Sequence, residues 1–297
     1  MVQSRSGKAL PLPPQSLRFM NEDDERLIHQ ADELADLLVR HGLDATSSVL
    51  DVGCGYGRLA LGLLHATDHD GPYLGFDIQS RSIAWCSSAL TPIFPKVRFA
   101  HLDVRSERYN PKGSIDPTTM SFPARSGTVD VCALFSVVTH LYRADIERYL
   151  TEIRRVLRPG GVAVVTWFLF DEARLPLVTS TQATYPMIHE LDADTRYMKE
   201  GEPLRAIAYR EAAVVAMAEA ARLEVRTIQR GTWAGEDGDV FQDLVVLARS
   251  TSDTTIDPDP ATSQGRPDRA ATARVDGRIR RLARRGRRLL RRLVGGR

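Results

Sequence analysis

The chain has 297 residues, of which 43% are hydrophobic and 26% charged, a composition that is sufficient for one buried α/β core with additional segments. Its net charge of +2 combines −6 in residues 1–249, −3 in residues 250–264 and +11 in residues 265–297, and the acidic body argues against a nucleic-acid-binding domain. The longest strongly apolar run, residues 161–170, has about half of the ~20 residues that a membrane-spanning helix needs, which excludes a transmembrane protein.

The first predicted elements are a Pro-rich N-terminal segment and a helix. Residues 1–20 contain no periodic pattern, and we expect them to be flexible. Asn21, followed by three acidic residues, is a good helix N-cap, and Gly42 is a typical helix end. The main domain is therefore expected to begin at residue 21 and to extend to residue 249.

From Ser48 onward, short apolar runs alternate with amphipathic helical patterns, which predicts a mainly parallel, doubly wound α/β sheet. The last two predicted strands are close enough in sequence to form an antiparallel pair. A long loop is expected at residues 104–127, and residues 171–207 show no steady period. The predicted strands are residues 48–52, 72–78, 96–104, 129–138, 161–170, 224–230 and 240–249, and the predicted helices are residues 58–65, 80–90, 146–157 and 211–223.

The C-terminal residues differ from the rest of the chain in composition. Residues 250–267 are rich in Pro, Asp, Ser and Thr and are predicted to be a disordered linker. In residues 268–297, leucines recur at helical spacing among arginines, which predicts a basic amphipathic helix. Such a helix suits an anionic membrane surface best because leucines add apolar burial to the charge attraction; nucleic acid is a weaker alternative, and a solvated tail is a third.

The cysteines and the N-terminal sequence indicate the cellular location. There are three cysteines and no CxxC pair, which favours buried thiols in a reducing compartment over a disulfide framework. No basic start followed by an apolar run is present, so no signal peptide is predicted. We expect a cytoplasmic protein, which the basic tail would hold at the inner membrane face if it binds lipid. The cysteines are Cys54, Cys86 and Cys132.

The stretch VLDVGCGYGRLA, residues 49–60, places three glycines at alternate positions directly after a strand. Ligands of open parallel sheets bind beyond the carboxyl ends of the strands, so Gly53, Gly55 and Gly57 are expected to line such a site. A dinucleotide site requires the spacing G-x-G-x-x-G, but here the spacing is G-x-G-x-G and Arg58 stands at the last glycine position. The spacing therefore weakens the interpretation as an NAD(P)-dependent oxidoreductase.

The same stretch resembles motif I of class I S-adenosylmethionine-dependent methyltransferases, an acidic residue followed by x-G-x-G-x-G. Further landmarks of that family follow in order: GFDI, HLDV, VDVCALFSVVTHL and EIRRVLRPGGVAVVTWF. The resemblance covers about residues 20–248, and the segments WCSSALTPIFP and YNPKG resemble a bacterial small-molecule or glycan-type subgroup. It implies an enzyme with a Rossmann-like, seven-stranded sheet of order 3-2-1-4-5-7-6, with strand 7 antiparallel.

The resemblance also implies residue roles toward S-adenosyl-L-methionine. Asp77 would accept hydrogen bonds from both ribose hydroxyls, and Ile78 would pack on the adenine. Each acidic residue also has a simpler interpretation, in which Asp51 satisfies a turn, Asp77 only ends a strand, or Asp103 belongs to a common LDV sequence. Asp103 and Val104 would border the adenine, and Asp51, Gly53 and Gly55 would hold the amino acid end.

The expected reaction is methylation of a hydroxyl on a small-molecule, glycan or lipid-linked acceptor, which requires a base. His140 is the candidate because it follows the fourth strand at the same sheet edge as the glycines; the alternative is that it caps a helix or orders a loop. Other candidate bases lie in residues 171–207, which with residues 1–20 are the expected acceptor cover. They are His189, with Tyr185 and Tyr197 nearby in sequence.

Three other functions stay open at this point: an RNA methyltransferase, an NAD(P)-dependent oxidoreductase, and a methyltransferase-like scaffold without activity. No metal site is predicted. His65 and His69 have helical i,i+4 spacing, but the sequence offers no evident third ligand.

Overall fold

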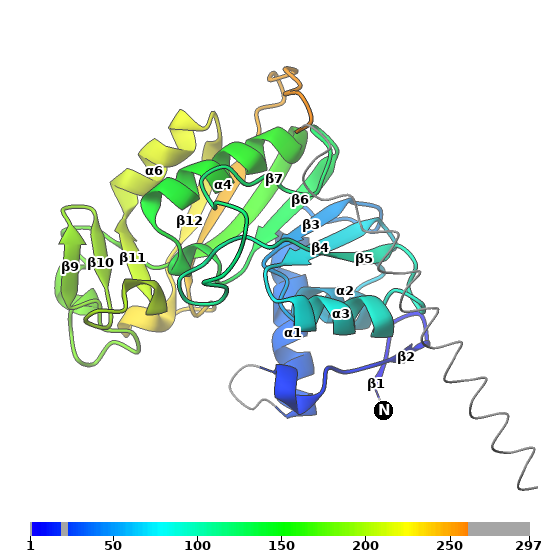
Figure 1. The fold of residues 1–297 in the computed structure, drawn as a ribbon. Coiled ribbons are helices and arrows are strands. Elements are labelled where there is room, and N and C mark those ends of the chain that lie inside the picture. The colour runs from blue at the N-terminus through cyan, green and yellow to red at the C-terminus, as the bar shows by residue number, and fades with distance from the viewer. Residues whose placement is uncertain (1, 19–22, 261–297) are drawn as a thin grey trace, which may run out of the picture. The chain divides into compact units, whose positions relative to one another are not determined.

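The structure is a computed structural model that describes residues 2–18 and 23–260. A seven-stranded sheet of order β12-β13-β7-β6-β3-β4-β5 forms its centre (Figure 1). Neighbouring strands from β7 to β5 are parallel, whereas β13 is antiparallel to both β7 and β12. The expected order 3-2-1-4-5-7-6 with a reversed seventh strand is therefore confirmed. The strands are β3 (Val49–Val52), β4 (Tyr73–Asp77), β5 (Val97–His101), β6 (Val129–Leu134), β7 (Leu157–Trp167), β12 (Glu224–Gln229) and β13 (Asp243–Ala248).

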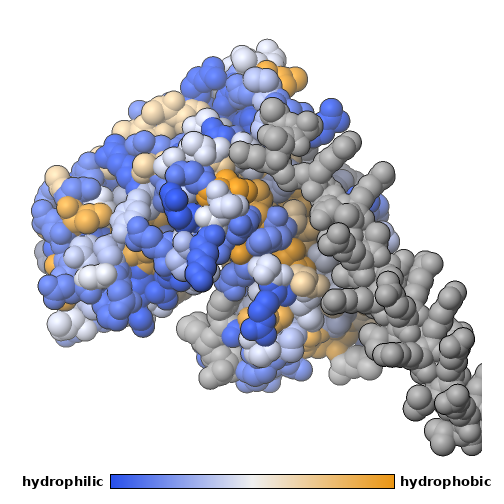
Figure 2. Space-filling model, in the orientation of Figure 1, coloured by the Kyte–Doolittle hydropathy of each residue, from blue (hydrophilic) through white to orange (hydrophobic). Residues whose placement is uncertain are grey.

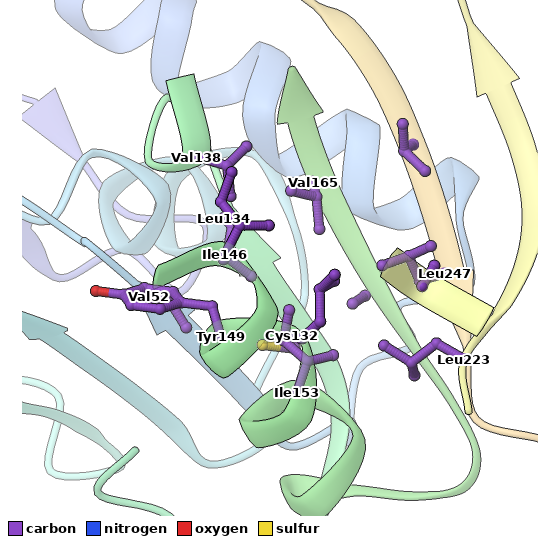
Figure 3. Close-up of a cluster of buried hydrophobic side chains, with 14 of the residues drawn as sticks. Val52, Cys132, Leu134, Val138, Ile146, Tyr149, Ile153, Val165, Leu223 and Leu247 are labelled. Atoms are coloured by element: carbon purple, nitrogen blue, oxygen red, sulfur yellow. The ribbon is translucent and has the colours of Figure 1, made fainter. Parts of the chain in front are cut away.

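Helices cover both faces of this sheet, because β3, β6, β7 and β13 are apolar on both sides. The core on one face includes residues of α4 (Arg143–Val156) and α6 (Glu211–Ala220). Figure 3 shows part of that core, where Ile153 of α4 lies near Cys132 of the sheet. The core on the other face includes residues of α1 (Asp24–Arg40) and α2 (Arg58–Ala66), while α3 (Ser80–Ala89) packs against β4 and β5.

Helices α1 and α2 touch at Gly62. A Cβ atom on Gly62 would lie 1.9 Å from the carbonyl oxygen of Ala31, so only glycine permits this approach. Helix α1 is capped by Asp23, whose side chain accepts a hydrogen bond from the Arg26 amide. The predicted cap, Asn21, lies outside the described residues.

The N-terminal segment, expected to be flexible, is paired and partly buried in its described part. Strand β1 (Val2–Gln3) pairs with β2 (Ala9–Leu10), and the Arg5 amide donates a hydrogen bond to the Leu64 carbonyl of α2 at 2.8 Å. Leu10 belongs to the core beside α1 and α2. Strand pairing, the hydrogen bond to α2 and the burial of Leu10 thus fix a segment whose sequence has no period. A short 3-10 helix, η1 (Gln15–Leu17), follows.

Residues 169–210 contain a second, four-stranded sheet that the sequence did not predict. Its order is β8-β11-β10-β9, and it lies beyond the end of β7 (Figure 1). A bulge between Thr195 and Arg196 and the exposed side chains of β9 remove the alternation that reveals a strand. Its elements are β8 (Leu169–Phe170), α5 (Leu175–Val178), β9 (His189–Asp192), β10 (Thr195–Tyr197), η4 (Pro203–Arg205) and β11 (Ile207–Arg210).

The described part of the predicted linker, residues 250–260, is bound to the domain by charge. Buried Arg154 of α4 forms ion pairs with Asp253 and Asp257. Asp259 accepts a hydrogen bond from the Ser126 amide at 2.7 Å. Residues 253–259 of the predicted linker thus have defined partners in the domain, because buried guanidinium groups require carboxylate partners. Residues 261–267 and the basic tail, residues 268–297, lie outside the described residues. No helix within the described residues is long and apolar enough to span a membrane.

Candidate active site

The carboxyl ends of the central strands carry the residues that the sequence singled out. The glycine loop follows β3, Asp77 ends β4, Asp103 follows β5, and the 3-10 helix η3 (Val138–His140) follows β6. Figure 2 shows that the surface is hollowed between the part of the molecule that carries β9–β11 and the part that carries α1. The fold thus brings four separate sequence landmarks to one edge of the sheet.

The backbone amides of the glycine loop are already hydrogen-bonded within the protein. The amides of Gly53 and Cys54 both donate to the Phe76 carbonyl, at 2.8 and 3.0 Å. The next amide, of Gly55, donates to the Asp77 carboxylate at 2.8 Å. A diphosphate cradle needs such amides to point at the ligand. The loop therefore suits a ligand without phosphate groups.

Glycine is required in this loop by conformation and by space. Gly53 and Gly57 have φ values of +70° and +80°, which favour glycine. A Cβ atom on Gly53 would lie 2.6 Å from Cγ2 of Val137, which follows β6. The loop after β6 thus packs directly on the glycine loop, and a ligand lying on this backbone also lies beside the loop after β6.

Asp77 connects the glycine loop to the start of α3. One carboxylate oxygen accepts from the Gly55 amide, and the other accepts from the Gln79 amide at 2.7 Å. The side chain is 7% exposed, and burial raises the pKa of Asp77, while these backbone hydrogen bonds lower it. Since each carboxylate oxygen can accept two hydrogen bonds, both oxygens keep capacity for a further donor.

Asp51 lies beneath the glycine loop and is 3% exposed. The Tyr73 hydroxyl donates a hydrogen bond to it at 2.5 Å. Burial raises the pKa of Asp51 to about 7; the Tyr73 hydrogen bond lowers it, and the nearby Asp77 charge raises it further. The carboxyl therefore ionises close to neutral pH, and a cation bound near it would favour its charged form.

Asp103 and Val104 contribute to the structure of the long loop that follows β5. The two carboxylate oxygens of Asp103 accept from the Asn110 side chain at 2.9 Å and from the Ser114 hydroxyl at 2.8 Å. Val104 is buried in the core, and Ile78 is partly buried against the same core. The loop is thereby fixed at the sheet edge, and contact of Asp103 and Val104 with adenine stays a prediction.

His140 ends η3 and is mostly buried. Its Nδ1 atom lies 2.9 Å from the Leu204 carbonyl oxygen of η4, which can only accept, so Nδ1 carries the proton. Burial lowers the pKa of His140, against the effect of this hydrogen bond. The ring is therefore neutral near pH 7, with Nε2 as its basic nitrogen. The N-cap of α4 is Tyr142, so His140 does not cap that helix, although its bond to Leu204 does order the loop.

The comparisons with known proteins decide among the candidate classes. Residues 49–161 match the family described as "Methyltransferase domain". Residues 49–161 are a methyltransferase domain. The matched segment contains the glycine loop, Asp77 and His140. Together with the observed strand order, this match confirms the expected class I methyltransferase and the enzyme class.

Solved structures similar to this methyltransferase include the PH0226 protein from Pyrococcus horikoshii OT3. It has a TM-score of 0.51 and 17% identity, with 79% of this chain and 95% of that chain covered, and it shows the same fold. A 1,6-didemethyltoxoflavin-N1-methyltransferase from Burkholderia thailandensis has a TM-score of 0.46 and 17% identity, covering 77% and 80%. A TehB-like SAM-dependent methyltransferase from Corynebacterium glutamicum has a TM-score of 0.43 and 16% identity, covering 73% and 87%.

The other candidate bases of the methyltransferase lie in or near its second sheet. The His189 ring stacks on Tyr197, with ring centroids 5.1 Å apart, and Tyr185 stacks on Phe168 at 5.3 Å. The second sheet has its own apolar core, which includes Phe168 and Trp233. Residues 171–207 therefore contribute to a folded unit with its own core rather than forming a loop.

The two histidines with i,i+4 spacing have protein partners. Nδ1 of His65 lies 2.9 Å from Asp32, and Nε2 of His69 lies 2.8 Å from the Ser47 carbonyl oxygen. No group of three metal-ligating side chains is found among residues 2–18 and 23–260.

Sequence reasoning missed the buried carboxylate of Asp243, which fixes the second sheet of the methyltransferase to the first. Asp243 is fully buried and accepts from the Leu169 amide at 2.7 Å, the Trp233 indole at 2.7 Å and the Gly231 amide at 2.8 Å. Arg174 pairs with it at 3.1 Å. An acidic residue directly before the apolar run of β13 was the signal that could have revealed it. Ser136, in a left-handed conformation, was also missed, because φ leaves no trace in a sequence.

Proposed function

We propose that this methyltransferase transfers the methyl group of S-adenosylmethionine to a hydroxyl oxygen of a small-molecule, glycan or lipid-linked acceptor. The observation that carries the proposal is the position of a neutral, partly buried His140 at the same sheet edge as the glycine loop and Asp77. Methylation of a hydroxyl needs a group that removes its proton, and a neutral imidazole does this near neutral pH.

The residues of the glycine loop and its neighbours fit this methyl donor. Asp77 keeps acceptor capacity for ribose hydroxyls, and Ile78 follows it as an apolar surface for adenine. Asp51, with Gly53 and Gly55, would hold the charged amino acid end on bare backbone. Asp103 and Val104 would border the adenine from the next strand end. Because the loop amides are bonded within the protein, these residues suit this donor better than a dinucleotide.

The protein's contribution to the reaction is positioning and proton removal. S-adenosylmethionine supplies an electrophilic methyl group on a positively charged sulfur, so activation of the methyl group itself needs little help. The sheet edge would hold the acceptor oxygen in line with it at about 3 Å. Nε2 of His140 would take the proton of the acceptor hydroxyl, and the second sheet would exclude water.

The proposal is tested by incubating the purified chain with methyl-labelled S-adenosylmethionine and fractions of a cell extract, followed by mass identification of the labelled product. We expect an O-methylated product that is lost with the His140→Gln variant. If the label is never transferred although S-adenosylhomocysteine binds, the chain is a scaffold and the proposal is wrong. A labelled nitrogen or carbon atom would contradict the hydroxyl acceptor alone.

We further propose that the basic tail, residues 268–297, holds the enzyme at an anionic membrane surface on the cytoplasmic side. The support is its arginine content together with leucines at helical spacing. The test is sedimentation with anionic liposomes of the full chain and of a chain that lacks residues 265–297. Loss of co-sedimentation on deletion is expected, and equal sedimentation of the two chains would refute the membrane role.

A further inference from the structure

Ser136, two residues after the end of β6, has a strained backbone at the edge of the proposed site. Its φ is +58°, a left-handed conformation that is unfavourable for a residue other than glycine. Two hydrogen bonds hold it: its amide donates to the Thr166 hydroxyl at 2.7 Å, and its own hydroxyl donates to the Gln242 side chain at 2.8 Å. Strain that the surroundings maintain in this way is concentrated at functional sites.

The strained residue connects the glycine loop to an aromatic pair, exposed Phe241 and partly buried Tyr185. On one side, the next residue, Val137, packs on Gly53. On the other side, Gln242 follows Phe241, whose side chain is 46% exposed. The ring of Phe241 meets that of Tyr185 edge-on, with centroids 5.7 Å apart. A continuous set of contacts thus leads from the methyl-donor loop to two aromatic rings.

The aromatic pair packs on the buried core of the second sheet. Tyr185 stacks on Phe168, whose ring centroid lies 4.8 Å from that of buried Trp233. Asp243, directly after Gln242, is fixed by the hydrogen bonds described above. Exposed aromatic side chains that are already immobilised lose little entropy on binding, which favours recognition of a ligand.

We propose that Ser136, Tyr185, Phe241 and Gln242 form the acceptor subsite and that it binds a neutral planar aromatic compound carrying a hydroxyl group. The proposal rests on the proposed function and narrows its acceptor class. None of the four side chains carries a formal charge at neutral pH. Since the Gln242 oxygen accepts from Ser136, its NH2 group is oriented to donate to the acceptor. The rings of Tyr185 and Phe241 would contact the aromatic face of the acceptor.

The test uses 2-naphthol as a planar probe and cyclohexanol as its non-planar counterpart. Calorimetry measures their binding to the full chain, with and without saturating S-adenosylhomocysteine. We expect 2-naphthol to bind at least ten-fold more tightly than cyclohexanol. The variants Phe241→Ala and Gln242→Ala should each weaken 2-naphthol binding about three- to ten-fold, the range expected for one aromatic contact or one neutral hydrogen bond.

The matched control is Leu191→Ala on β9 of the second sheet, which removes an apolar side chain whose exposure, 47%, is similar to that of Phe241. It should bind 2-naphthol like the parent chain. The subsite is refuted if 2-naphthol binds no better than cyclohexanol, or if the two variants bind it as the parent does. The S-adenosylhomocysteine affinity, expected within two-fold of the parent in all three variants, is measured separately. If the parent chain does not bind S-adenosylhomocysteine, the proposed function is refuted. The titration with 2-naphthol in the absence of S-adenosylhomocysteine would still test the subsite.

Discussion

The buried carboxyl of Asp51 should make the enzyme less stable as the pH rises. Burial raises the pKa of Asp51 from 3.8 to about 7, so between these values the folded state keeps a proton that the unfolded chain has lost. The free energy of unfolding then falls by about 1.4 kcal/mol per pH unit, from full stability below pH 3.8 to a constant lower value above pH 7. Asp51→Asn removes this dependence. Relative to the variant, the parent should lose about 2–3 kcal/mol between pH 5 and pH 7.

Urea denaturation of both chains at pH 5 and pH 7 measures the effect. All other groups titrate nearly alike in the two chains, so the change in their stability difference isolates Asp51. A difference that stays constant within about 0.5 kcal/mol would refute the reasoning, since that is the usual limit of such comparisons. The same variant should bind S-adenosylhomocysteine at least ten-fold more weakly, because an amide cannot pair with the charged amino group. The ionised carboxylate of Asp51 thus lowers the free energy of unfolding near neutral pH, and the same charge strengthens binding of the cofactor's amino group.

Three further perturbations test the packing, the C-terminal segment and the base. Gly62→Ala should lower the free energy of unfolding in urea by about 2–3 kcal/mol, because its Cβ would lie 1.9 Å from a backbone oxygen of α1. The control Gly238→Ala, whose Cβ would have no contact under 3.4 Å, should lower it by less than about 1 kcal/mol. Equal losses in the two variants would contradict this packing of α1 on α2. Replacing Asp253 and Asp257 together by Asn leaves a buried guanidinium without carboxylates and should lower the melting temperature by several degrees, and an unchanged melting curve would contradict that role. His140→Gln should reduce methyl transfer at least ~100-fold with unchanged S-adenosylhomocysteine affinity. Since burial lowers the pKa of His140, the acidic midpoint of the parent's activity should lie below pH 6.5 when S-adenosylmethionine is saturating, so that protonation of Asp51 does not limit binding; a midpoint above that pH would contradict a desolvated base.

The central sheet was predictable because each of its strands carries a strong local signal. Val49–Val52, Val129–Leu134 and Asp243–Ala248 are apolar except for one aspartate each and are almost wholly buried, as expected for strands covered on both faces. Their order could not come from periodicity, and the family landmarks supplied it. Asp77 and the glycine loop were found for the same reason, since strand ends and glycines are visible in the sequence.

What the sequence did not reveal depends on contacts between distant residues. The second sheet has exposed strands and a bulge, so its alternation is weak. Residues 250–260 look disordered by composition, and only the buried partner Arg154 explains why they are bound. The hydrogen bond between Ser136 and Gln242 joins residues 106 positions apart. Local composition carries no information about such pairs, which only the folded chain defines.

The most direct test of the whole account is calorimetry with S-adenosylhomocysteine on the parent chain, on Asp77→Asn and on Asp103→Asn. Asp77 is proposed to hold the ribose through its carboxylate oxygens, whereas Asp103 is proposed only to border the adenine, and both of its oxygens bind loop residues of the protein. We predict that the parent binds with measurable heat, that Asp77→Asn binds at least ten-fold more weakly, and that Asp103→Asn stays within about three-fold of the parent. No heat with the parent, or equal affinity of the parent and Asp77→Asn, would contradict the central claim.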